Sequence, residues 1–132
     1  MTAEEQKDRK VLVIDDDMDF IEANKAVLEE KGYQVAYALN GQDGLAKAFS
    51  DKPHLIVLDV MMNTVDEGFD VARQLRNNPD TRNIPLIMLT AINQKSGFPW
   101  KYDKDEAWLP VDIFLEKPLK PNELLENVRR LL

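Results

Sequence analysis

The sequence of 132 residues contains no cysteine, and this absence removes several kinds of chemistry. Without thiols the chain has no disulfide bond, no thiolate zinc site and no cysteine nucleophile. No apolar run approaches the roughly 20 residues that a membrane-spanning helix needs. The N-terminal segment Met1–Arg9 is charged, which is not typical of a signal peptide. We therefore expect a soluble, cytoplasmic protein with no membrane partner.

Positive charge is also scarce in this chain. The 17 Lys and Arg residues face 24 Asp and Glu residues, which gives a net charge of −7. A domain that binds nucleic acid by itself needs a basic surface, so direct nucleic-acid binding is not expected. Hydrophobic residues make up 44% of the chain, a normal content for a globular protein. The length suits one domain with one core, and we assign residues 1–9 to a tail and 10–132 to that domain.

Short segments rich in apolar residues alternate with segments of helical periodicity. The apolar segments are Val11–Ile14, Gln34–Leu39, Leu55–Leu58, Pro85–Leu89 and Val111–Leu115. Helices are predicted over Asp19–Lys31, Gly41–Ser50 and Phe69–Asn77, and from Pro121 to the end of the chain. Unbroken apolar runs are typical of strands buried on both faces. The alternation predicts an α/β protein with a doubly wound, five-stranded parallel sheet and right-handed crossovers.

Four of the five apolar segments lead into a polar residue that can do chemistry. The first is followed by Asp15 and Asp16, the third by Asp59, the fourth by Thr90, and the fifth by Lys117 one residue further on. In an open parallel α/β sheet, ligands bind outside the carboxyl ends of the strands. If the first, third, fourth and fifth strands are neighbours, these side chains meet in one pocket.

Three carboxylates close together repel one another. Two such charges at about 4 Å repel by roughly 4 kcal/mol at an effective dielectric constant near 20. A bound cation relieves this repulsion, and oxygen ligands without Cys or His favour Mg²⁺, or Mn²⁺ as a second choice. Because Mg²⁺ uses one or two carboxylates together with phosphate oxygens, one carboxylate remains as a nucleophile. A nearby lysine and a threonine hydroxyl would stabilise the phosphoryl oxygens.

Each of these residues also has a simpler interpretation when it is taken alone. Asp17 or Asp19 is expected to cap the helix that follows the first strand. An aspartate at the end of a strand, such as Asp59, is commonly a turn residue. His54 starts a strand without an evident chemical partner, and we interpret it as structural. The joint placement at strand ends is what favours phosphoryl chemistry.

Four motifs resemble the receiver domains of bacterial two-component response regulators. They are Val11–Asp17, Leu55–Met62, Ile87–Ala91 and Phe114–Pro118, and the resemblance extends over Lys10–Leu132. It implies a flavodoxin-like (βα)5 fold with strand order 2-1-3-4-5. It also implies a phosphorylation-controlled signalling switch, which makes 10–132 a receiver domain and not an enzyme in the usual sense. Its own chemistry would be self-phosphorylation from a phosphodonor and slow self-dephosphorylation.

The resemblance implies a role for each residue of the acidic cluster. Asp59 corresponds, by this resemblance, to the aspartate that accepts the phosphoryl group in the family. Asp16 corresponds to a direct ligand of Mg²⁺ and Asp15 to a ligand through water. Asp59 and the backbone carbonyl of Met61 complete the implied metal site.

The remaining motif residues correspond to the family's switch machinery. Thr90 resembles the switch hydroxyl, and Lys117 the phosphate-binding lysine. Phe114 stands at the position of the switch aromatic, and Lys117-Pro118 is expected to be a cis peptide. The implied phosphodonor is a sensor histidine kinase or a histidine phosphotransfer protein. The implied output is a downstream protein partner or an attached output domain.

The chain departs from the family pattern after Asp59. Asn63 stands where the family commonly has proline, and Asp66–Gly68 carries one extra residue. The residue two positions after Asp59 is Met61, whose side chain cannot orient a water for attack on a phosphoryl group. We therefore expect slow self-dephosphorylation.

The segment between Thr90 and Lys117 is longer than the family pattern and unusually aromatic. Its Pro and Gly residues disfavour a long helix, so the fourth helix is expected to be short or irregular, at most Asp103–Trp108. Two interpretations stay open: the aromatic side chains pack locally over a shortened helix, or they form a surface for a partner or a homodimer. The residues of this possible surface are Phe98, Trp100, Tyr102 and Trp108.

Two other functions compete with the switch. A phosphatase of the haloacid dehalogenase type also uses strand-end aspartates and Mg²⁺, and Asp15 with Asp17 could form its motif. That motif requires Thr or Val where this chain has Asp19, and it leaves Asp59 without a role. The other alternative is a pseudo-receiver that binds partners without being phosphorylated.

Overall fold

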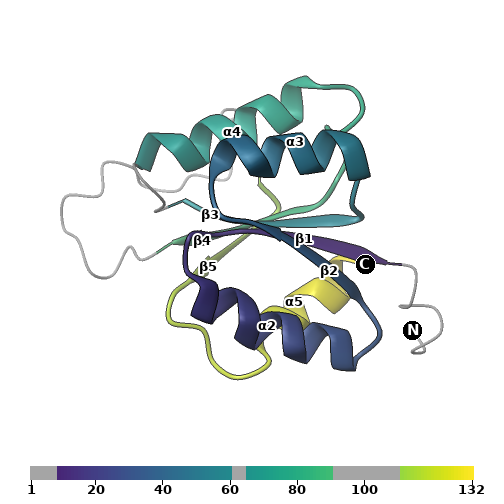
Figure 1. Ribbon diagram of the computed structural model, residues 1–132, viewed down its shortest axis with the longest axis vertical. Helices are drawn as coiled ribbons and strands as arrows, with labels where there is room; N and C mark the ends of the chain where they lie inside the picture. The colour runs from purple at the N-terminus through teal and green to yellow at the C-terminus, as the bar shows by residue number, and fades with distance from the viewer. Residues whose placement is uncertain (1–8, 61–64, 91–110) are drawn as a thin grey trace.

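The computed structural model describes residues 9–60, 65–90 and 111–132, and its five strands form one parallel sheet (Figure 1). The strands are β1 (Lys10–Ile14), β2 (Gln34–Ala38), β3 (Leu55–Asp59), β4 (Leu86–Thr90) and β5 (Ile113–Glu116). Their order across the sheet is β2-β1-β3-β4-β5. The predicted fold class and strand order are confirmed. This order makes β1, β3, β4 and β5 successive neighbours, as a shared pocket at their ends requires.

Helices cover both faces of the sheet. The described helices are α2 (Met18–Glu30), α3 (Gly41–Asp51), α4 (Val65–Asn77) and α5 (Glu123–Leu131). Figure 1 shows α3 and α4 side by side over one face and α2 and α5 over the other. The predicted short or irregular fourth helix falls within residues 91–110, outside the described residues. None of the described helices is long and apolar enough to cross a membrane.

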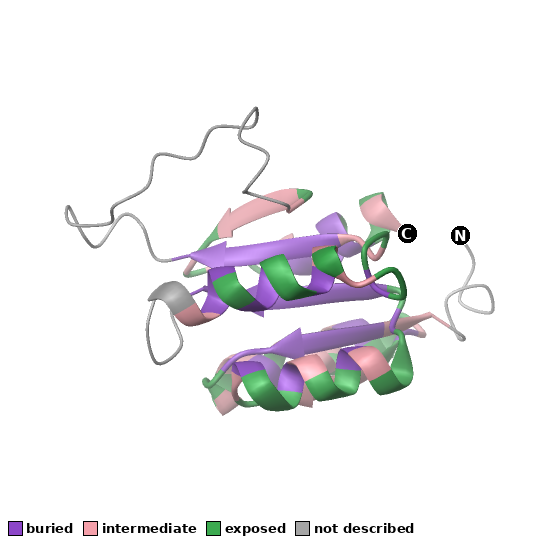
Figure 2. Ribbon diagram, turned by 90° about the horizontal axis from the view of Figure 1, so that it is seen from above, coloured by how far each residue is buried: buried purple, intermediate pink, exposed green. Residues whose placement is uncertain are grey.

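Two separate cores result from the alternation of side chains along the strands. Val11 and Val13 pack with α2 and α5, whereas Leu12 and Ile14 pack with α3 and α4. All five residues of β3 and all five of β4 are buried, so these strands are enclosed from both sides (Figure 2). This is why the sequence shows unbroken apolar runs instead of an alternating pattern.

Several element boundaries differ from the sequence prediction. Asp59 and Thr90 belong to their strands, since a backbone ladder continues regardless of side-chain polarity. The last strand begins at Ile113 instead of Val111 and ends at Glu116, whose pairing partner is Thr90. Helix α4 begins at Val65, ahead of the predicted start at Phe69. Its first turn is mainly polar and carries no apolar periodicity that the sequence could reveal.

Two local predictions concern single side chains near strand ends. Asp17 is the N-cap of α2, and its carboxylate accepts a hydrogen bond from the Phe20 backbone N–H at 3.2 Å. Of the two aspartates proposed for this role, Asp17 is therefore the cap. His54 accepts a hydrogen bond at Nδ1 from the backbone N–H of Lys10, at 2.9 Å. This bond joins the starts of β1 and β3, which is a structural role.

Tyr33 places a hydroxyl group in an apolar core. The residue is 3% exposed, and its hydroxyl has no hydrogen-bond partner within the part of the chain that is described. Burial raises the pKa of Tyr33, although the charges of Arg129 and Arg9 act to lower it. Replacing Tyr33 with phenylalanine should raise the free energy of unfolding by about 1 kcal/mol, because an unpaired buried hydroxyl is removed.

Urea unfolding of the Tyr33→Phe variant tests this expectation. Tyr37→Phe serves as the matched control, because Tyr37 is only half buried and should change stability by less than about 0.5 kcal/mol. A Tyr33→Phe protein that is clearly less stable than the parent would mean that the hydroxyl is hydrogen-bonded in solution.

Candidate functional site

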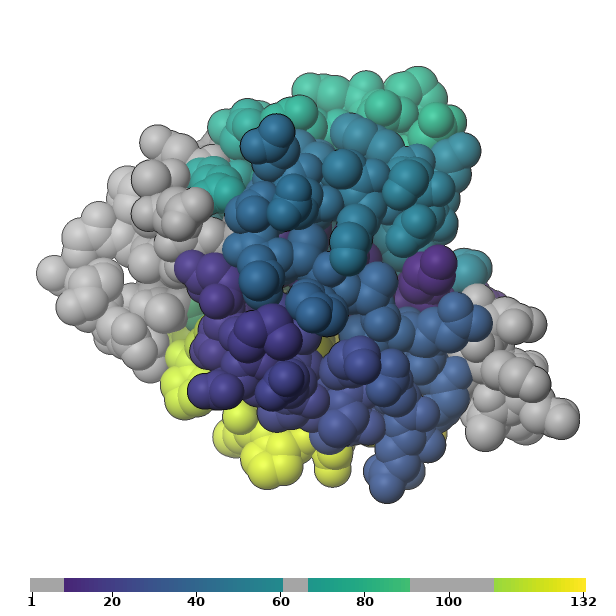
Figure 3. Space-filling model, viewed as in Figure 1, coloured from purple at the N-terminus to yellow at the C-terminus, as the bar shows by residue number. Residues whose placement is uncertain are grey.

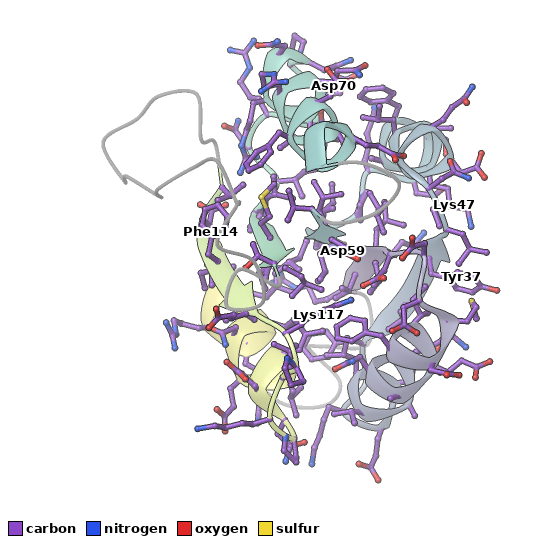
Figure 4. All side chains as sticks on the ribbon, turned by 90° about the vertical axis from the view of Figure 1, so that its left-hand side faces the viewer. Tyr37, Lys47, Asp59, Asp70, Phe114 and Lys117 are labelled. Carbon is purple, nitrogen blue, oxygen red and sulfur yellow. The ribbon has the colours of Figure 1, made fainter. Side chains whose placement is uncertain are left out.

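The polar residues that follow the apolar runs meet at the carboxyl edge of the sheet. Asp15 follows β1, Asp59 and Thr90 end β3 and β4, and Lys117 follows β5. Figure 4 faces this edge and shows Asp59 and Lys117 near its centre, between the two helical layers. Asp15 and Lys117 are 102 positions apart in the chain, yet their side chains are in direct contact. The side chains of Asp15, Asp59 and Lys117 thus come together at this edge, as expected.

Three carboxylates form the acidic part of the site. One oxygen from each of Asp15, Asp16 and Asp59 lies within 4.8 Å of the others. Asp15 and Asp59 are buried, whereas Asp16 is exposed. These hard oxygen donors suit Mg²⁺, which coordinates carboxylates and keeps several waters. Asp16, as the exposed member of the cluster, is the carboxylate that solvent water reaches.

Lys117 supplies the positive charge that this cluster contacts. Its Nζ donates a hydrogen bond to Asp15 Oδ2 at 2.8 Å and lies 3.5 Å from Asp59 Oδ2. Only 19% of the Lys117 side chain is exposed. The ammonium group therefore bridges two buried carboxylates from different strands.

The pKa values show that one lysine does not balance the cluster. Burial is the largest effect on Asp15; together with the Asp59 charge it outweighs the hydrogen bond from Lys117 and raises the pKa of Asp15 to about 6. For Lys117, burial lowers the pKa, but the hydrogen bond to Asp15 and the charges of Asp59, Asp15 and Asp17 raise it by more. Lys117 thus stays charged, while Asp15 carries an electrostatic cost when ionised. A further cation beside these carboxylates would lower that cost.

Thr90 and Phe114 lie on the strands next to the cluster. Thr90 is 1% exposed, and its backbone carbonyl accepts a hydrogen bond from the Lys117 N–H at 2.6 Å. This bond holds the turn after β5 against the end of β4. Phe114 is half buried, pairs with Met88 across the sheet and packs on the α3–α4 side. The peptide bond between Lys117 and Pro118 is cis.

Several predicted residues lie outside the described part of the chain. They are Met61, proposed as a carbonyl ligand, and the aromatic residues Phe98, Trp100, Tyr102 and Trp108. The roles proposed for them stay predictions.

The tertiary structure also brings in residues that sequence reasoning missed. The ring of Phe20 on α2 lies 4.3 Å from Lys117 Nζ, measured to the ring centroid. Glu67 Oε2 accepts a hydrogen bond from the Gly41 N–H at 2.8 Å, which ties the start of α4 to the start of α3. A Cβ at Gly68 would lie 2.5 Å from Val60 Cα, so only glycine lets α4 approach the end of β3 this closely. The sequence marks Phe20 as a residue of the apolar face of the helix over Asp19–Lys31, which gives no sign of a contact with Lys117.

A groove of about 570 Å³ runs beside the site, between α2 and the connection from β5 to α5. Figure 3 shows these two segments side by side at the lower left of the molecule. Phe20 and Lys117 both line the groove, as do Asp17, Asn24 and Pro118. Phe20 therefore borders the groove and also contacts the lysine of the acidic cluster.

Comparison with known families resolves which kind of protein carries this site. The response regulator receiver domain matches residues 11–129. The chain belongs to this family. It is a regulatory receiver domain of the two-component type, a phosphoryl-accepting signalling switch, and the expectation from the four motifs is confirmed. The match gives no support to a phosphatase of the haloacid dehalogenase type or to a pseudo-receiver.

Individual relatives agree with this assignment. The receiver domain is 38% identical to the DNA-binding dual master transcriptional regulator RpaA of Synechocystis, over 93% of this chain and 48% of that protein. The chain thus spans about half the length of that curated relative. Its fold matches the chemotaxis response regulator CheY4 of Vibrio cholerae, with a TM-score of 0.77, 28% identity, and 94% and 98% of the two chains covered. It also matches TrrA of Thermotoga maritima in complex with Mg²⁺ and BeF, with a TM-score of 0.75, 31% identity, and coverage of 94% and 99%.

Proposed function

We propose that Asp59 accepts the phosphoryl group in this receiver domain, with a phosphohistidine as the donor. The observation that carries this proposal is the placement of Asp59 in the cluster: it is buried, it lies 3.5 Å from the Lys117 ammonium, and it shares the site with Asp15 and Asp16. Asp59 stands at the end of β3, the central strand of the sheet, which lies between β1 and β4.

The transfer itself requires little covalent chemistry from the protein. An Asp59 carboxylate oxygen attacks phosphorus, an O–P bond forms, and the N–P bond of the phosphohistidine breaks in line with it. The electron pair of that bond returns to the imidazole nitrogen of the donor. Charge grows on the equatorial phosphoryl oxygens, and Lys117 is placed to neutralise part of it. Lys117 gives this help by shifting its hydrogen bond from Asp15 toward the new phosphoryl oxygens.

The cation site proposed here consists of Asp15, Asp16 and Asp59, with the Met61 carbonyl as a further ligand. The donor chemistry fits Mg²⁺, with Mn²⁺ as a second cation that takes the same oxygen ligands. TrrA, solved in complex with Mg²⁺ and BeF, supports a magnesium site in this family. When bound, the cation neutralises the carboxylates and the phosphoryl oxygens that meet there.

The readout of phosphorylation is assigned to Thr90 and Phe114. Thr90 ends β4, next to β3, and its hydroxyl would donate a hydrogen bond to a phosphoryl oxygen on Asp59. Phe114 on β5 is the switch aromatic whose rotamer would follow Thr90. The aromatic surface of Phe98, Trp100, Tyr102 and Trp108 remains a proposed site for a partner or a homodimer.

The proposed partners follow from the family. The donor is a sensor histidine kinase or a histidine phosphotransfer protein, and the output is a downstream partner or an attached output domain. RpaA is named as DNA-binding, and this chain spans about half of it. The net charge of −7 supports an output that does not place this domain itself on nucleic acid. We place the domain in the cytoplasm, as residues 10–132 following a tail of residues 1–9.

Mass spectrometry after treatment with acetyl phosphate and Mg²⁺ tests the assignment of Asp59. The parent protein should gain one phosphoryl adduct, and Asp59→Asn should gain none, because the amide is not a nucleophile for this transfer. Asp70→Asn is the matched control, an exposed aspartate on α4 away from the cluster. An adduct on Asp59→Asn would reassign the acceptor, and a parent protein without any adduct would favour the pseudo-receiver. Steady hydrolysis of a generic aryl phosphate would favour the phosphatase.

The lifetime of the adduct is a separate expectation. Because Met61 cannot orient an attacking water, the phosphorylated protein should decay slowly once the donor is removed. Met61→Glu should shorten the lifetime, since a carboxylate at this position can hold a water. A parent adduct that decays within seconds would contradict the assignment of Met61.

A further inference from the structure

Lys117 is held from two sides, and only one of them is acidic. Its Nζ contacts Asp15 and Asp59, and on another side it lies 4.3 Å from the centroid of the Phe20 ring. An ammonium group within about 6 Å of a ring face is attracted by the quadrupole of the ring. Phe20 therefore attracts this ammonium without competing for the carboxylate or phosphoryl oxygens.

Phe20 is itself fixed at both backbone groups. Its N–H donates to Asp17 Oδ1 at 3.2 Å, and its carbonyl accepts from Asn24 Nδ2 at 3.0 Å. These bonds involve the residue that caps α2 and a side chain one turn further along the helix. The backbone that carries the ring is thus held in the first turns of α2 and not in a flexible connection.

The contacts around Phe20 form a ring that starts and ends at Asp15. The Asp17 N–H donates to Asp15 Oδ1 at 2.9 Å, and the Asp17 carboxylate caps Phe20. The Phe20 ring contacts Lys117, and Lys117 returns to Asp15 Oδ2 at 2.8 Å. One buried carboxylate therefore orients both the helix that carries the ring and the lysine that the ring contacts.

We infer that Phe20 is the positioning residue for Lys117 in phosphoryl acceptance, an assignment that rests on the proposed function. The attraction of the ring keeps Nζ at the boundary between Asp15 and Asp59. When a phosphoryl group reaches Asp59, Lys117 has to shift its hydrogen bond only a short way. Without the ring, Lys117 can turn toward the groove, where Asp17 offers a competing carboxylate.

Aromatic and aliphatic replacements of Phe20 separate the effect of the aromatic ring from the effect of side-chain size. With acetyl phosphate and Mg²⁺, Phe20→Leu should lower the rate of phosphorylation about three- to tenfold, whereas Phe20→Tyr should stay within about twofold of the parent. Phe20→Met is a second ringless variant, in case the leucine variant does not fold. Val27→Ala is the matched control: it removes apolar surface from the same groove on the same helix and should leave the rate unchanged.

A second measurement reports the contact without any phosphorylation. In the metal-free protein, the ring should shift the NMR signals of the Lys117 Hε protons upfield, with Lys117→Arg used to assign them. The shift should persist in Phe20→Tyr and vanish in Phe20→Leu. An absent shift in the parent would overturn the contact, and equal rates for all variants would overturn the positioning role.

The same assay distinguishes a failure of the proposed function from a failure of the role inferred for Phe20. A parent protein that takes no phosphoryl group would overturn that function and this inference together. In contrast, a parent that is phosphorylated normally while Phe20→Leu matches it would overturn the inference alone.

Discussion

Replacing Asp15 with asparagine should raise the free energy of unfolding of the metal-free protein by about 3 kcal/mol at neutral pH. Asp15 is completely buried, and that burial, with the charge of Asp59, raises its pKa to about 6 from the ordinary 3.8. The folded protein therefore prefers the neutral form of this side chain. Asparagine is neutral at every pH and has nearly the same shape.

The pH dependence of the effect has a definite sign. Because the pKa of Asp15 is higher in the folded than in the unfolded state, protonation stabilises the folded protein. The parent should lose stability relative to Asp15→Asn as pH rises from about 4 to about 6, and the difference should stay constant above that. Urea unfolding in a chelator at a series of pH values measures the difference directly.

Bound Mg²⁺ should reduce the stability advantage of Asp15→Asn over the parent. The cation stabilises the folded parent by binding to the carboxylates, and Asp15→Asn removes one of them. Saturating Mg²⁺ should therefore narrow or reverse the difference between the two proteins. Asp70→Asn, on the exposed face of α4, should show neither effect. A metal-free Asp15→Asn protein that is less stable than the parent would mean that the hydrogen bond to Lys117 outweighs burial.

Replacing Lys117 with methionine should have the largest combined effect on stability and activity. The change leaves the buried Asp15 and Asp59 without their shared cation, which should cost about 3 kcal/mol of unfolding free energy without metal. The rate of phosphorylation should fall about 100-fold or more, since a charge that stabilises the phosphoryl oxygens is lost. Chemical unfolding and the acetyl phosphate assay measure the two quantities.

Lys120→Met is the matched control for this change. Lys120 is an exposed lysine in the same connection before α5, and within the described residues no hydrogen bond or ion pair joins its side chain to the cluster. The double variant Asp15→Asn, Lys117→Met adds a further test, because contacting residues are not additive. The loss from Lys117→Met should be smaller when Asp15 is already neutral. An equal loss in both backgrounds would show that the ion pair with Asp15 does not carry the effect, which would then come from Asp59 or from packing.

The identity and location of the acidic cluster could be predicted from the sequence. Asp15, Asp59 and Thr90 directly follow or end buried apolar runs, and the carboxyl ends of parallel strands share one edge of the sheet. Strand boundaries were less predictable: Asp59 and Thr90 lie inside their strands because ladder hydrogen bonds depend on the backbone. The resemblance to receiver domains supplied the strand order, which periodicity cannot.

The sequence by itself determined which chemical groups stand at the strand ends, because strand burial and strand direction are local properties of each run. Only the tertiary structure decided how those groups are connected. The sharing of Lys117 between Asp15 and Asp59, the rise in the pKa of Asp15 and the ring of Phe20 beside the ammonium all depend on contacts between distant segments. Electrostatic energies of this kind depend on distances of a few ångströms between charged groups. Such short distances exist only once the sheet has brought β1, β3 and β5 together with α2.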